Sequence, residues 1–511
     1  MRLIRRASVR GPRARVVAAL AAIAIATPSA VAAAVLSPFS ECQLKSQTGP
    51  QQRSAECARL RVAEDPSQAD GAQIELFVAR IRSLRPEPEK DAVLLINGGP
   101  GGSSVELYLS LGPAFARLLE ARDLLVLDQR GTGRSNPLLC PEALAGQTDP
   151  FDDALPEGVV GACLDELQSD PRHYTTSVAV QDIEALRIAG GYERLTLYGV
   201  SYGTRVALHY LRRYPDAVRA LILDGLVPPE VLLGPNIALN ADATLTQIFA
   251  RCADTPACAR RYPDLGDRFR ANLAALKQQR IDLRVDHPIS GRAEPQTYGY
   301  TALAVVLRLL NYAPETAALV PYLVEEALAG RFEAITAQAL MLMDNLNEAL
   351  AMGMHNAVAC TEDAPFLPSP DAAARTQLEA TFIGAAQSDA LRAMCAQWPR
   401  GPLDPAFHEP LVSDKPVLLL SGEFDPITPP AYGAITARTL ANARHIVAPG
   451  QGHGVIGRGC IPRLAAEFVA AGSAAELDAA CVDDLAPLPF FLGPMGPVAA
   501  SPASAREADT P

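Results

Sequence analysis

RLTLYGVSYGTRVALHYLRRY, from Arg194 to Tyr214, contains the pattern that decides the fold. Its first part, RLTLYGV, is rich in β-branched and aromatic residues that favour strands, and its last part, YGTRVALHYLRRY, has the spacing of an amphipathic helix. Between them stands G-x-S-x-G, from Gly199 to Gly203, a pattern typical of a sharp turn that holds a serine above a sheet. The stretch predicts a strand, a turn at Ser201 and a helix.

Similar apolar runs recur on both sides of this stretch. They are QIELFVARIRS (73–83), AVLLING (92–98), DLLVLDQRG (123–131), AVRALILDGL (217–226), KPVLLLSGEFD (415–425) and RHIVAPGQGHG (444–454). Helical patterns such as SVAVQDIEALRIAGG (177–191) separate several of them. This alternation predicts an α/β fold with a doubly wound, mostly parallel sheet that is covered on both faces.

The alternation lapses between residues 232 and 410, where amphipathic helices are broken by proline-bearing loops. We predict that residues 232–410 form a helical cap. The cap is inserted into a core made of residues 34–231 and 411–485 and lies above the carboxyl ends of the strands, where open α/β sheets bind ligands.

The two ends of the chain differ from the rest. Residues 1–33 have a cationic start, a short apolar run and a small-residue cleavage site at Ala30-Val31-Ala32, which favours a signal peptide over an uncleaved anchor. We therefore expect export to the periplasm or the cell exterior, with no membrane span after cleavage. Residues 486–511, rich in proline, glycine and alanine, predict a loosely held, flexible tail.

Composition narrows the possible partners and cofactors. The formal net charge of −12 argues against a nucleic-acid-binding surface. The sequence contains neither a C-x-x-C pair nor H-E-x-x-H, so we expect no metal site, and no cofactor is indicated. No motif sets the oligomeric state.

The cysteine content agrees with export, because disulfides persist in oxidising compartments. All ten cysteines lie beyond the predicted signal peptide. Sequence alone does not fix their connectivity, but taken in chain order they form five neighbouring pairs: Cys42 with Cys57, Cys140 with Cys163, Cys252 with Cys258, Cys360 with Cys395, and Cys460 with Cys481.

A serine nucleophile at Ser201 needs a base within hydrogen-bond reach, and that base must itself be oriented. Of the seven histidines, only His453 lies in a glycine-rich loop just after a late predicted strand, whereas His445 lies inside the strand pattern and is expected to be packed. Asp425 ends the strand KPVLLLSGEFD and is the expected orienting acid. Glu423, two residues earlier, is the alternative.

The glycine-rich loop NGGPGG (97–102) follows the strand AVLLI and predicts an oxyanion hole. We expect the backbone N–H groups of Gly99 and Tyr202 to be its donors. A phosphate-binding loop is the competing interpretation, but no G-K-[ST] follows and the dinucleotide spacing G-x-G-x-x-G is missing.

Together these motifs resemble the tripeptidyl aminopeptidase and prolyl iminopeptidase branch of the α/β-hydrolases. NGGPGGSS (97–104), DQRGTGRS (128–135), GVSYG (199–203), GEFDPITP (422–429) and GQGHG (450–454) stand in that family's order, and CTEDAP (360–365), CAQWP (395–399) and GCIPRL (459–464) resemble its TAP-like C-terminal region. Asp128 and Arg130 resemble the family's structural turn beside the oxyanion loop. Asn97 stands where simple iminopeptidases have histidine, as it often does in the secreted, disulfide-bearing members.

The resemblance implies a serine hydrolase that acts on a peptide or a small ester. The leading hypothesis is an exopeptidase that releases residues or short peptides from free N-termini through an acyl-enzyme. The alternatives are a carboxylesterase acting on small esters or lactones, and a non-catalytic binding protein on a hydrolase scaffold. An exopeptidase must hold a cationic amine, and the resemblance places Glu362 and Asp363 near the substrate. These acids are therefore the candidates for that role, against a structural one in their loop.

Overall fold

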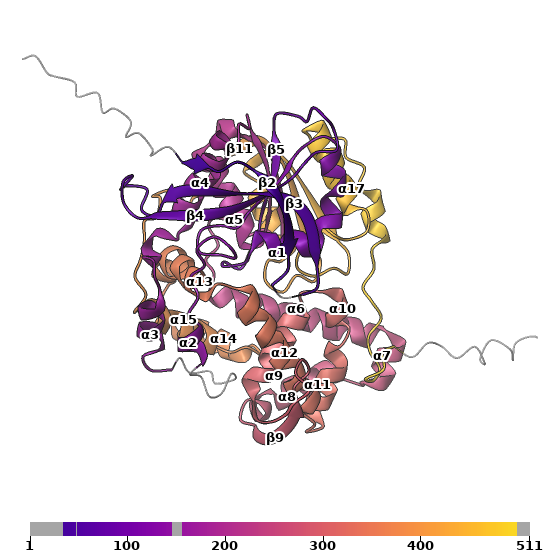
Figure 1. Cartoon of the computed structure of the whole chain (residues 1–511). Helices are drawn as coiled ribbons and strands as arrows, with labels where there is room; N and C mark the ends of the chain where they lie inside the picture. The colour runs from indigo at the N-terminus through magenta and orange to yellow at the C-terminus, as the bar shows by residue number, and fades with distance from the viewer. Residues whose placement is uncertain (1–33, 48, 146–155, 498–511) are drawn as a thin grey trace, which may run out of the picture.

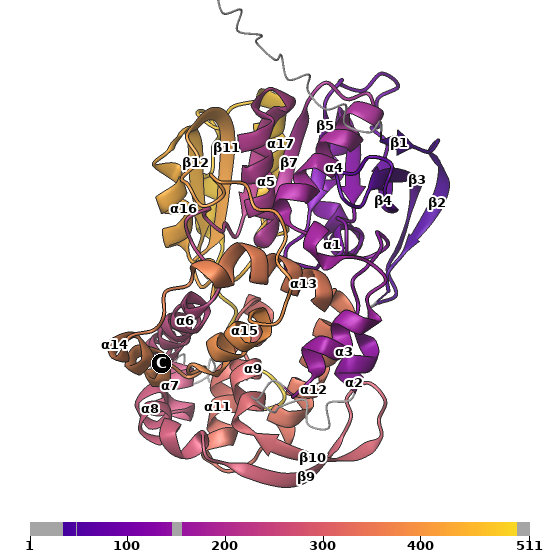
Figure 2. The same ribbon diagram turned by 90° about the vertical axis from the view of Figure 1, so that its left-hand side faces the viewer.

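A large sheet with helices on both faces forms the core of the protein, and a mainly helical cap lies over one end of it (Figures 1 and 2). The structure, a computed structural model, describes residues 34–47, 49–145 and 156–497. The predicted signal peptide, residues 1–33, lies outside the described residues. In the part described, no helix has the length and apolar character that a membrane crossing needs.

The sheet has a parallel part and an antiparallel part. In sheet order its strands are β1 (Val35–Leu36), β3 (Gln52–Ala63), β4 (Gln73–Ile81), β6 (Leu124–Leu127), β5 (Ala92–Ile96), β7 (Leu195–Val200), β8 (Val218–Asp224), β11 (Ser413–Gly422) and β12 (Leu440–Ala448), with β2 (Ser40–Lys45) paired to β3. Strands β6, β5, β7, β8, β11 and β12 pair parallel with one another, whereas β1 to β4 pair antiparallel and β4 joins β6 antiparallel. The predicted mostly parallel α/β sheet is confirmed.

Strand β5 shows why the central strands read as continuous apolar runs. Leu94 and Ile96 pack in a cluster with α4 (Thr176–Ala189) and α5 (Tyr202–Arg213) on one face of the sheet. Val93 and Leu95 pack on the other face with α1 (Ser104–Leu111) and α17 (Ile461–Ala471). Because successive side chains of a strand point to opposite faces, a sheet covered on both sides needs apolar residues at every position.

Strands β1 to β3 are not indicated by the sequence patterns above. Strand β3, QRSAECARLRVA, carries three arginines and a glutamate, and its buried positions alternate with exposed ones. A strand with one solvated face keeps polar residues on that face, so its apolar content stays low.

The cap lies between β8 and β11, within the predicted insertion. Its elements include α6 (Pro235–Asp254), α7 (Pro256–Arg261), α8 (Leu265–Leu276), α9 (Tyr300–Leu310), α11 (Val320–Leu328), α12 (Glu333–Ala349), α13 (Met352–Val358) and α15 (Ala386–Cys395). Two antiparallel strands, β9 (Arg280–Asp286) and β10 (Ala293–Gly299), interrupt the expected run of helices. Helix α13 packs on the sheet's own cluster through Met354, Ala357 and Val358, so this part of the insertion joins the cap to the core.

The segment of residues 486–497 differs from the expected flexible tail. It runs from the core beside α17 down to α7 in the cap (Figure 1). Phe490 is 3% exposed within the hydrophobic cluster of the cap. The backbone N–H of Phe491 donates to Ala318 O at 3.0 Å, and Tyr262 donates to Phe491 O at 3.0 Å. Apolar phenylalanines in the proline-rich stretch are the residues that bury it; residues 498–511 lie outside the described part.

All ten cysteines are joined, and the pairing in chain order is confirmed. The bridges are Cys42–Cys57, Cys140–Cys163, Cys252–Cys258, Cys360–Cys395 and Cys460–Cys481. Cys252–Cys258 links α6 to α7, and Cys360–Cys395 links the segment after α13 to the end of α15. The bridges within the cap therefore limit how neighbouring helices can move apart.

Candidate active site

Ser201 occupies the turn between β7 and α5, as the sequence predicts. Its backbone has φ +56° and ψ −126°, a strained conformation for a residue with a side chain. A Cβ on Gly199 would lie 2.4 Å from Gly203 O, and a Cβ on Gly203 would lie 2.4 Å from Ile96 O. Both glycines are therefore required for the helix to start this close to the sheet.

The turn at Ser201 is fixed by hydrogen bonds to the adjoining strand. The Ser201 N–H donates to Asp224 O at 2.9 Å. Thr204 Oγ1 donates to Ser201 O at 2.6 Å and accepts from the Val227 N–H at 2.9 Å. The serine backbone is held on both sides, while its side chain stays partly exposed.

His453 and Asp425 are hydrogen-bonded to each other. His453 Nδ1 lies 2.8 Å from Asp425 Oδ2, and the carboxylate is almost fully buried. Asp425 Oδ1 accepts from the backbone N–H groups of Ile427 and Thr428 at 2.9 and 2.8 Å. Thr428 Oγ1 donates to Asp425 Oδ2 at 2.8 Å and lies 3.1 Å from His453 Nδ1. The Asp425 carboxylate is thus held in place by hydrogen bonds that are independent of its contact with the imidazole.

The loop that carries His453 is held from the cap and from the core. The His453 N–H donates to Tyr312 O at 2.7 Å, and the Tyr312 ring packs edge-on against the imidazole, with centroids 5.1 Å apart. On the core side, Asp224 accepts from the N–H groups of Val455 and Ile456 at 2.8 to 2.9 Å. The imidazole therefore has a fixed position at the junction of the two parts.

The charges around His453 favour its protonated form. Burial by itself would lower the pKa of His453, but the charge and hydrogen bond of Asp425, with the charge of Asp224, outweigh it and raise the pKa above its ordinary value. A base with a raised pKa accepts a proton readily from a hydroxyl.

Two glycines next to Ser201 and His453 indicate how close these two residues lie to each other. A Cβ on Gly98 would lie 2.6 Å from Ser201 Cβ, and a Cβ on Gly225 would lie 2.9 Å from His453 Cε1. Gly225 follows β8, the strand paired to β7, so the imidazole packs beside the turn that carries Ser201. No hydrogen bond joins Ser201 Oγ to His453 in the part of the chain that the structure describes. Such bonds are often long before substrate binds.

The loop of residues 97–102 lies directly beside Ser201. Asn97 Oδ1 accepts from the Gly98 N–H at 2.7 Å, and Asn97 Nδ2 donates to Ser103 O at 2.8 Å. Gly99 has φ +116°, a region that side chains rarely adopt, and it lines the cavity next to Ser201. The Asn97 side chain therefore shapes this loop.

Asp128 and Arg130 lie behind this loop in a buried turn. Asp128 Oδ1 accepts from Ser103 Oγ at 2.7 Å and from the Val105 N–H at 3.1 Å. Arg130 forms a buried ion pair with Asp182, with two N–O distances of 2.6 and 2.7 Å. Asp128 therefore holds the residues that directly follow the loop, whereas Arg130 joins the turn to α4.

A cavity of about 300 Å³ contains the candidate nucleophile. Its core side comes from Gly99, Ser201 and Tyr202. Its cap side comes from residues of α6, α9, α13 and α15, among them Ile237, Arg308, Met352, His355, Asn356, Leu391 and Met394. The cap thus closes over the ends of the strands at Ser201.

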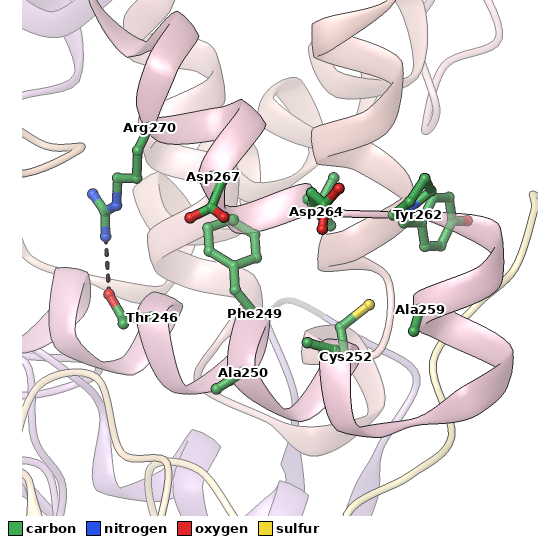
Figure 3. A pocket seen from close by; sticks show the side chains of 13 residues that line it. Thr246, Phe249, Ala250, Cys252, Ala259, Tyr262, Asp264, Asp267 and Arg270 are labelled. Carbon is green, nitrogen blue, oxygen red and sulfur yellow. Dashed lines mark hydrogen bonds between the residues drawn. The ribbon is translucent and has the colours of Figure 1, made fainter.

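A second cavity of about 470 Å³ lies in the cap between α6, α7 and α8 (Figure 3). Phe249, Tyr262 and Asp267 line it, and Arg270 reaches Thr246 across its rim, at 2.9 Å (Figure 3). Arg270 also pairs with Asp242 at 2.7 Å. None of the residues predicted to be catalytic lines this cavity.

Glu362 and Asp363 are fully buried and already have partners inside the protein. Glu362 accepts from the Thr176 N–H at 2.6 Å and lies 2.9 Å from Thr176 Oγ1. Asp363 accepts from Arg205 Nη1 at 3.0 Å and from the Leu233 N–H at 2.8 Å. Neither acid is among the residues that line the cavity at Ser201. Their amine-binding role stays a prediction, and this geometry favours a structural one.

Burial also changes the charge of Glu362. It raises the pKa of Glu362 to about 8, despite the opposing charge of Arg205 and the hydrogen bonds from Thr176. The side chain is therefore largely protonated at neutral pH, and a neutral carboxyl attracts an ammonium group weakly.

His445 and Glu423, the alternatives to His453 as base and Asp425 as acid, form hydrogen bonds with other residues. His445 Nε2 lies 2.9 Å from Ser421 Oγ within the sheet, and burial lowers the pKa of this histidine. Glu423 accepts from the Gly450 N–H at 2.8 Å. His445 is packed as expected, and Glu423 holds the turn that follows β12.

Sequence reasoning missed two residues of this site, Asp224 and Thr428. Asp224 ends the apolar run LILD just as Asp425 ends the stretch KPVLLLSGEFD, and that shared position was the available signal. Thr428 had no signal, because a threonine in a proline-rich loop is ordinary. Its contacts with both Asp425 and His453 depend on the fold of that loop.

Two family models match the chain in regions that contain these residues. The model of the α/β hydrolase fold matches residues 91–278, which include Ser201, and the model described as TAP-like protein matches residues 380–481, which include Asp425 and His453. The fold and the strained serine turn define a serine hydrolase. The chain is a serine hydrolase of the α/β-hydrolase fold with a TAP-like C-terminal region, and it is similar to proteins named serine protease and tripeptidyl aminopeptidase.

Relatives similar to this chain have peptidase and esterase names. Serine protease Hip1 of Mycobacterium tuberculosis is 26% identical over 83% of this chain and 87% of its own. Carboxylesterase B of the same species is 28% identical over 81% of this chain and 84% of its own. Tripeptidyl aminopeptidase of Streptomyces coelicolor is 30% identical over 34% of this chain and 36% of its own.

Proposed function

We propose that Ser201 is the nucleophile of this enzyme, His453 its general base and Asp425 the acid that orients His453. The 2.8 Å contact between His453 Nδ1 and Asp425 Oδ2 carries the proposal, because it leaves Nε2 as the nitrogen that can accept a proton. Gly99 and Tyr202, both beside Ser201 in the cavity, supply backbone N–H groups to the oxyanion.

In the first half of the reaction, Ser201 Oγ attacks the scissile carbonyl carbon and His453 takes the hydroxyl proton. The tetrahedral intermediate collapses when His453 returns that proton to the leaving amine or alcohol, which departs and leaves an ester on Ser201. Water then attacks the ester with His453 again as base, the acid product is released, and the serine regains its proton.

The size of the cavity supports an exopeptidase. At about 300 Å³ it is at the small end of ordinary ligand pockets, about 300 to 1,000 Å³. A partly closed space of this size, covered by the cap, fits the end of a peptide better than the middle of a long chain. Together with the relatives named as peptidases, it supports release of residues or short peptides from free N-termini.

A specific observation favours carboxylesterase as the second candidate. The described residues that line the cavity at Ser201 include no carboxylate that could bind a cationic amine. A small neutral ester needs no such group. A relative named as a carboxylesterase covers most of the chain.

Export to the periplasm or the cell exterior is also part of the proposal. Five disulfides support it, because such bonds are rare in reducing compartments.

The test combines a serine-directed fluorophosphonate probe with a panel of substrates. The wild type should label, and Ser201→Ala should not label and should lose several orders of magnitude in kcat. His453→Ala should lose nearly as much, whereas His445→Ala should change stability more than rate. Labelling of Ser201→Ala at the wild-type level would refute the nucleophile.

The panel pairs a peptide with a free N-terminus, the same peptide N-acetylated, and an uncharged nitrophenyl ester. Faster cleavage of the free peptide supports the exopeptidase. Efficient cleavage of the acetylated peptide rejects the need for a free amine, and cleavage of the ester alone supports the second candidate.

A further inference from the structure

The cavity at Ser201 carries a single permanent charge among its described lining residues, and that charge is the guanidinium of Arg308. His355 also lines the cavity, but burial lowers its pKa and the charge of Arg308 lowers it further, so the imidazole is neutral at neutral pH. The described side chains that line the cavity at Ser201 therefore carry a net positive charge.

Arg308 has no carboxylate partner in the part of the chain described here: no ion pair involves it, and its Nε is buried without a hydrogen bond. Arg308 forms a hydrogen bond with Tyr312, and this bond and the charge of Arg308 act to lower the pKa of Tyr312. Burial of the tyrosine has the larger effect, so its pKa is raised. Other cap arginines are paired: Arg268 with Glu325 at 2.6 Å, Arg270 with Asp242 at 2.7 Å and Arg331 with Glu326 at 2.6 Å.

A guanidinium without a carboxylate partner is costly to hold in a cavity wall, and Arg308 is partly buried there. Transfer of a charge out of water lowers stability unless an opposite charge or hydrogen bonds replace the lost hydration. A methionine or leucine would fill the same place without that cost. The Arg308 guanidinium, which has a hydrogen bond to Tyr312 but no carboxylate partner among the described residues, can therefore bind an anionic group that arrives with the substrate.

The chain fixes Arg308 relative to the candidate base. Arg308 lies in α9 one helical turn before Tyr312, whose carbonyl accepts from the His453 N–H at 2.7 Å. The same segment of the cap therefore carries Arg308 and supports His453. A substrate group bound by Arg308 would be held at a set distance from the reacting carbonyl.

We propose that Arg308 is a specificity-determining residue that binds a carboxylate of the substrate. A guanidinium binds a carboxylate through two parallel hydrogen bonds, which fixes orientation as well as charge. The carboxylate has two possible sources: an acidic side chain on the acyl part, or the free C-terminal carboxylate of a short peptide. This inference rests on the proposed function, since it takes Ser201 as the reacting group.

Matched substrates separate the charge from the rest of the molecule. The mono-4-nitrophenyl ester of succinic acid and 4-nitrophenyl butyrate have acyl chains of equal length and differ in one carboxylate. Peptides with glutamate or glutamine next to the scissile bond form a second pair. Short peptides as free acids or C-terminal amides form a third pair.

For the wild type we expect kcat/KM to favour the carboxylate-bearing member at least about tenfold in one or more pairs. The pair that responds identifies the source of the carboxylate. Arg308→Gln should remove that preference, lowering kcat/KM about 10- to 100-fold for the charged member and less than about threefold for the neutral one. Arg308→Lys, which keeps the charge without the paired donors, should lie between them.

Arg331→Gln is the control, because it removes the same charge from an exposed site of the cap. This variant should leave the ratio of kcat/KM between the charged and the neutral member of every substrate pair unchanged. Equal loss on charged and neutral substrates in both Arg308 variants, or no preference in the wild type for any pair, would overturn the proposal. Fluorophosphonate labelling is followed in parallel: an unlabelled wild type contradicts the proposed function, whereas a labelled wild type without a carboxylate preference contradicts only the role of Arg308.

Discussion

Asp224 binds Val455, two residues beyond His453, with both carboxylate oxygens: the Val455 N–H lies 2.8 Å from Oδ1 and 2.9 Å from Oδ2. The Ile456 N–H donates to Oδ2 at 2.9 Å, and Tyr198 donates to the same oxygen at 3.0 Å. This buried acid at the end of β8 therefore sets the course of the loop that carries His453, and its charge raises the pKa of that histidine.

The first prediction concerns Asp224→Asn. The variant lacks the negative charge, so the pKa of His453 should fall, and the acid limb of the kcat/KM profile should move to lower pH because the base must be unprotonated to act. The amide also cannot accept from two backbone N–H groups with its nitrogen, so we expect about 1–3 kcal/mol lower unfolding free energy. A pH profile and a denaturant titration measure these effects.

Tyr198→Phe is the matched control, because it removes a hydrogen bond to the same carboxylate and leaves the charge in place. Its acid limb should stay close to that of the wild type. A profile of Asp224→Asn with an unmoved acid limb would show that Asp224 supports the loop without acting on His453.

The second prediction concerns Glu362→Gln. Because the pKa of Glu362 in the folded protein, about 8, lies above its ordinary value, the folded state holds this proton more tightly than the unfolded state. The stability that the protonated Glu362 contributes to the folded state is therefore complete below the ordinary pKa, and it is lost as pH rises through about 8. Glutamine resembles the protonated form and has no such loss.

Thermal unfolding between about pH 5 and pH 9 tests this. The Tm of Glu362→Gln should match the wild type at the acid end and exceed it at the alkaline end. A Tm of Glu362→Gln that falls further below the wild-type Tm as pH rises would contradict the prediction.

The same variant decides between the two roles of Glu362. If this acid binds the substrate amine, the substitution raises KM for free peptides and leaves a nitrophenyl ester unaffected. If its role is structural, as its bonds to Thr176 suggest, both substrates respond alike.

The third prediction concerns the segment of residues 486–497. Phe490 is 3% exposed in the hydrophobic cluster of the cap, and the guanidinium of Arg251 lies 3.8 Å from the centre of its ring. Phe490→Ala should lower the free energy of unfolding by about 3 kcal/mol, as large-to-small changes at buried aromatics do. It should also expose the segment to proteases.

Met495→Ala is the control within the same segment, since Met495 is 96% exposed. It should change neither Tm nor the rate of proteolysis. Equal behaviour of the two variants would mean that the segment is not held by Phe490.

The fourth prediction compares two disulfides of different loop length. Cys360 and Cys395 are 35 residues apart, whereas Cys252 and Cys258 are 6 apart. In the chain-entropy account, the longer loop stabilises more, by about 1.5 kcal/mol. Denaturant unfolding of double alanine variants should show the larger loss of unfolding free energy for the Cys360–Cys395 pair and the smaller loss for the Cys252–Cys258 pair.

Peptide mapping of unreduced protein from its native compartment should find both links, and free thiols at all ten cysteines would contradict export.

Much of the core followed from the sequence because the physical signals there are local. The parallel strands are continuous apolar runs, since both faces of the sheet are buried, and the serine turn is marked by two glycines that steric contact requires. The antiparallel strands β1 to β3 and the pair β9–β10 escaped the same reasoning. Their exposed faces carry polar residues, so burial leaves only a weak pattern.

The sequence by itself determined the residue types that the chemistry needs, their order and the class of fold, because strand, turn and capping preferences act over a few neighbouring residues. Only the tertiary structure decided which residues meet. It brought Asp224 to the loop of His453, buried Glu362 and Asp363 away from the cavity, and placed Arg308, which has no carboxylate partner among the described residues, in the wall of the cavity at Ser201. These relationships join segments more than a hundred residues apart, and packing between distant segments leaves no local mark in a sequence.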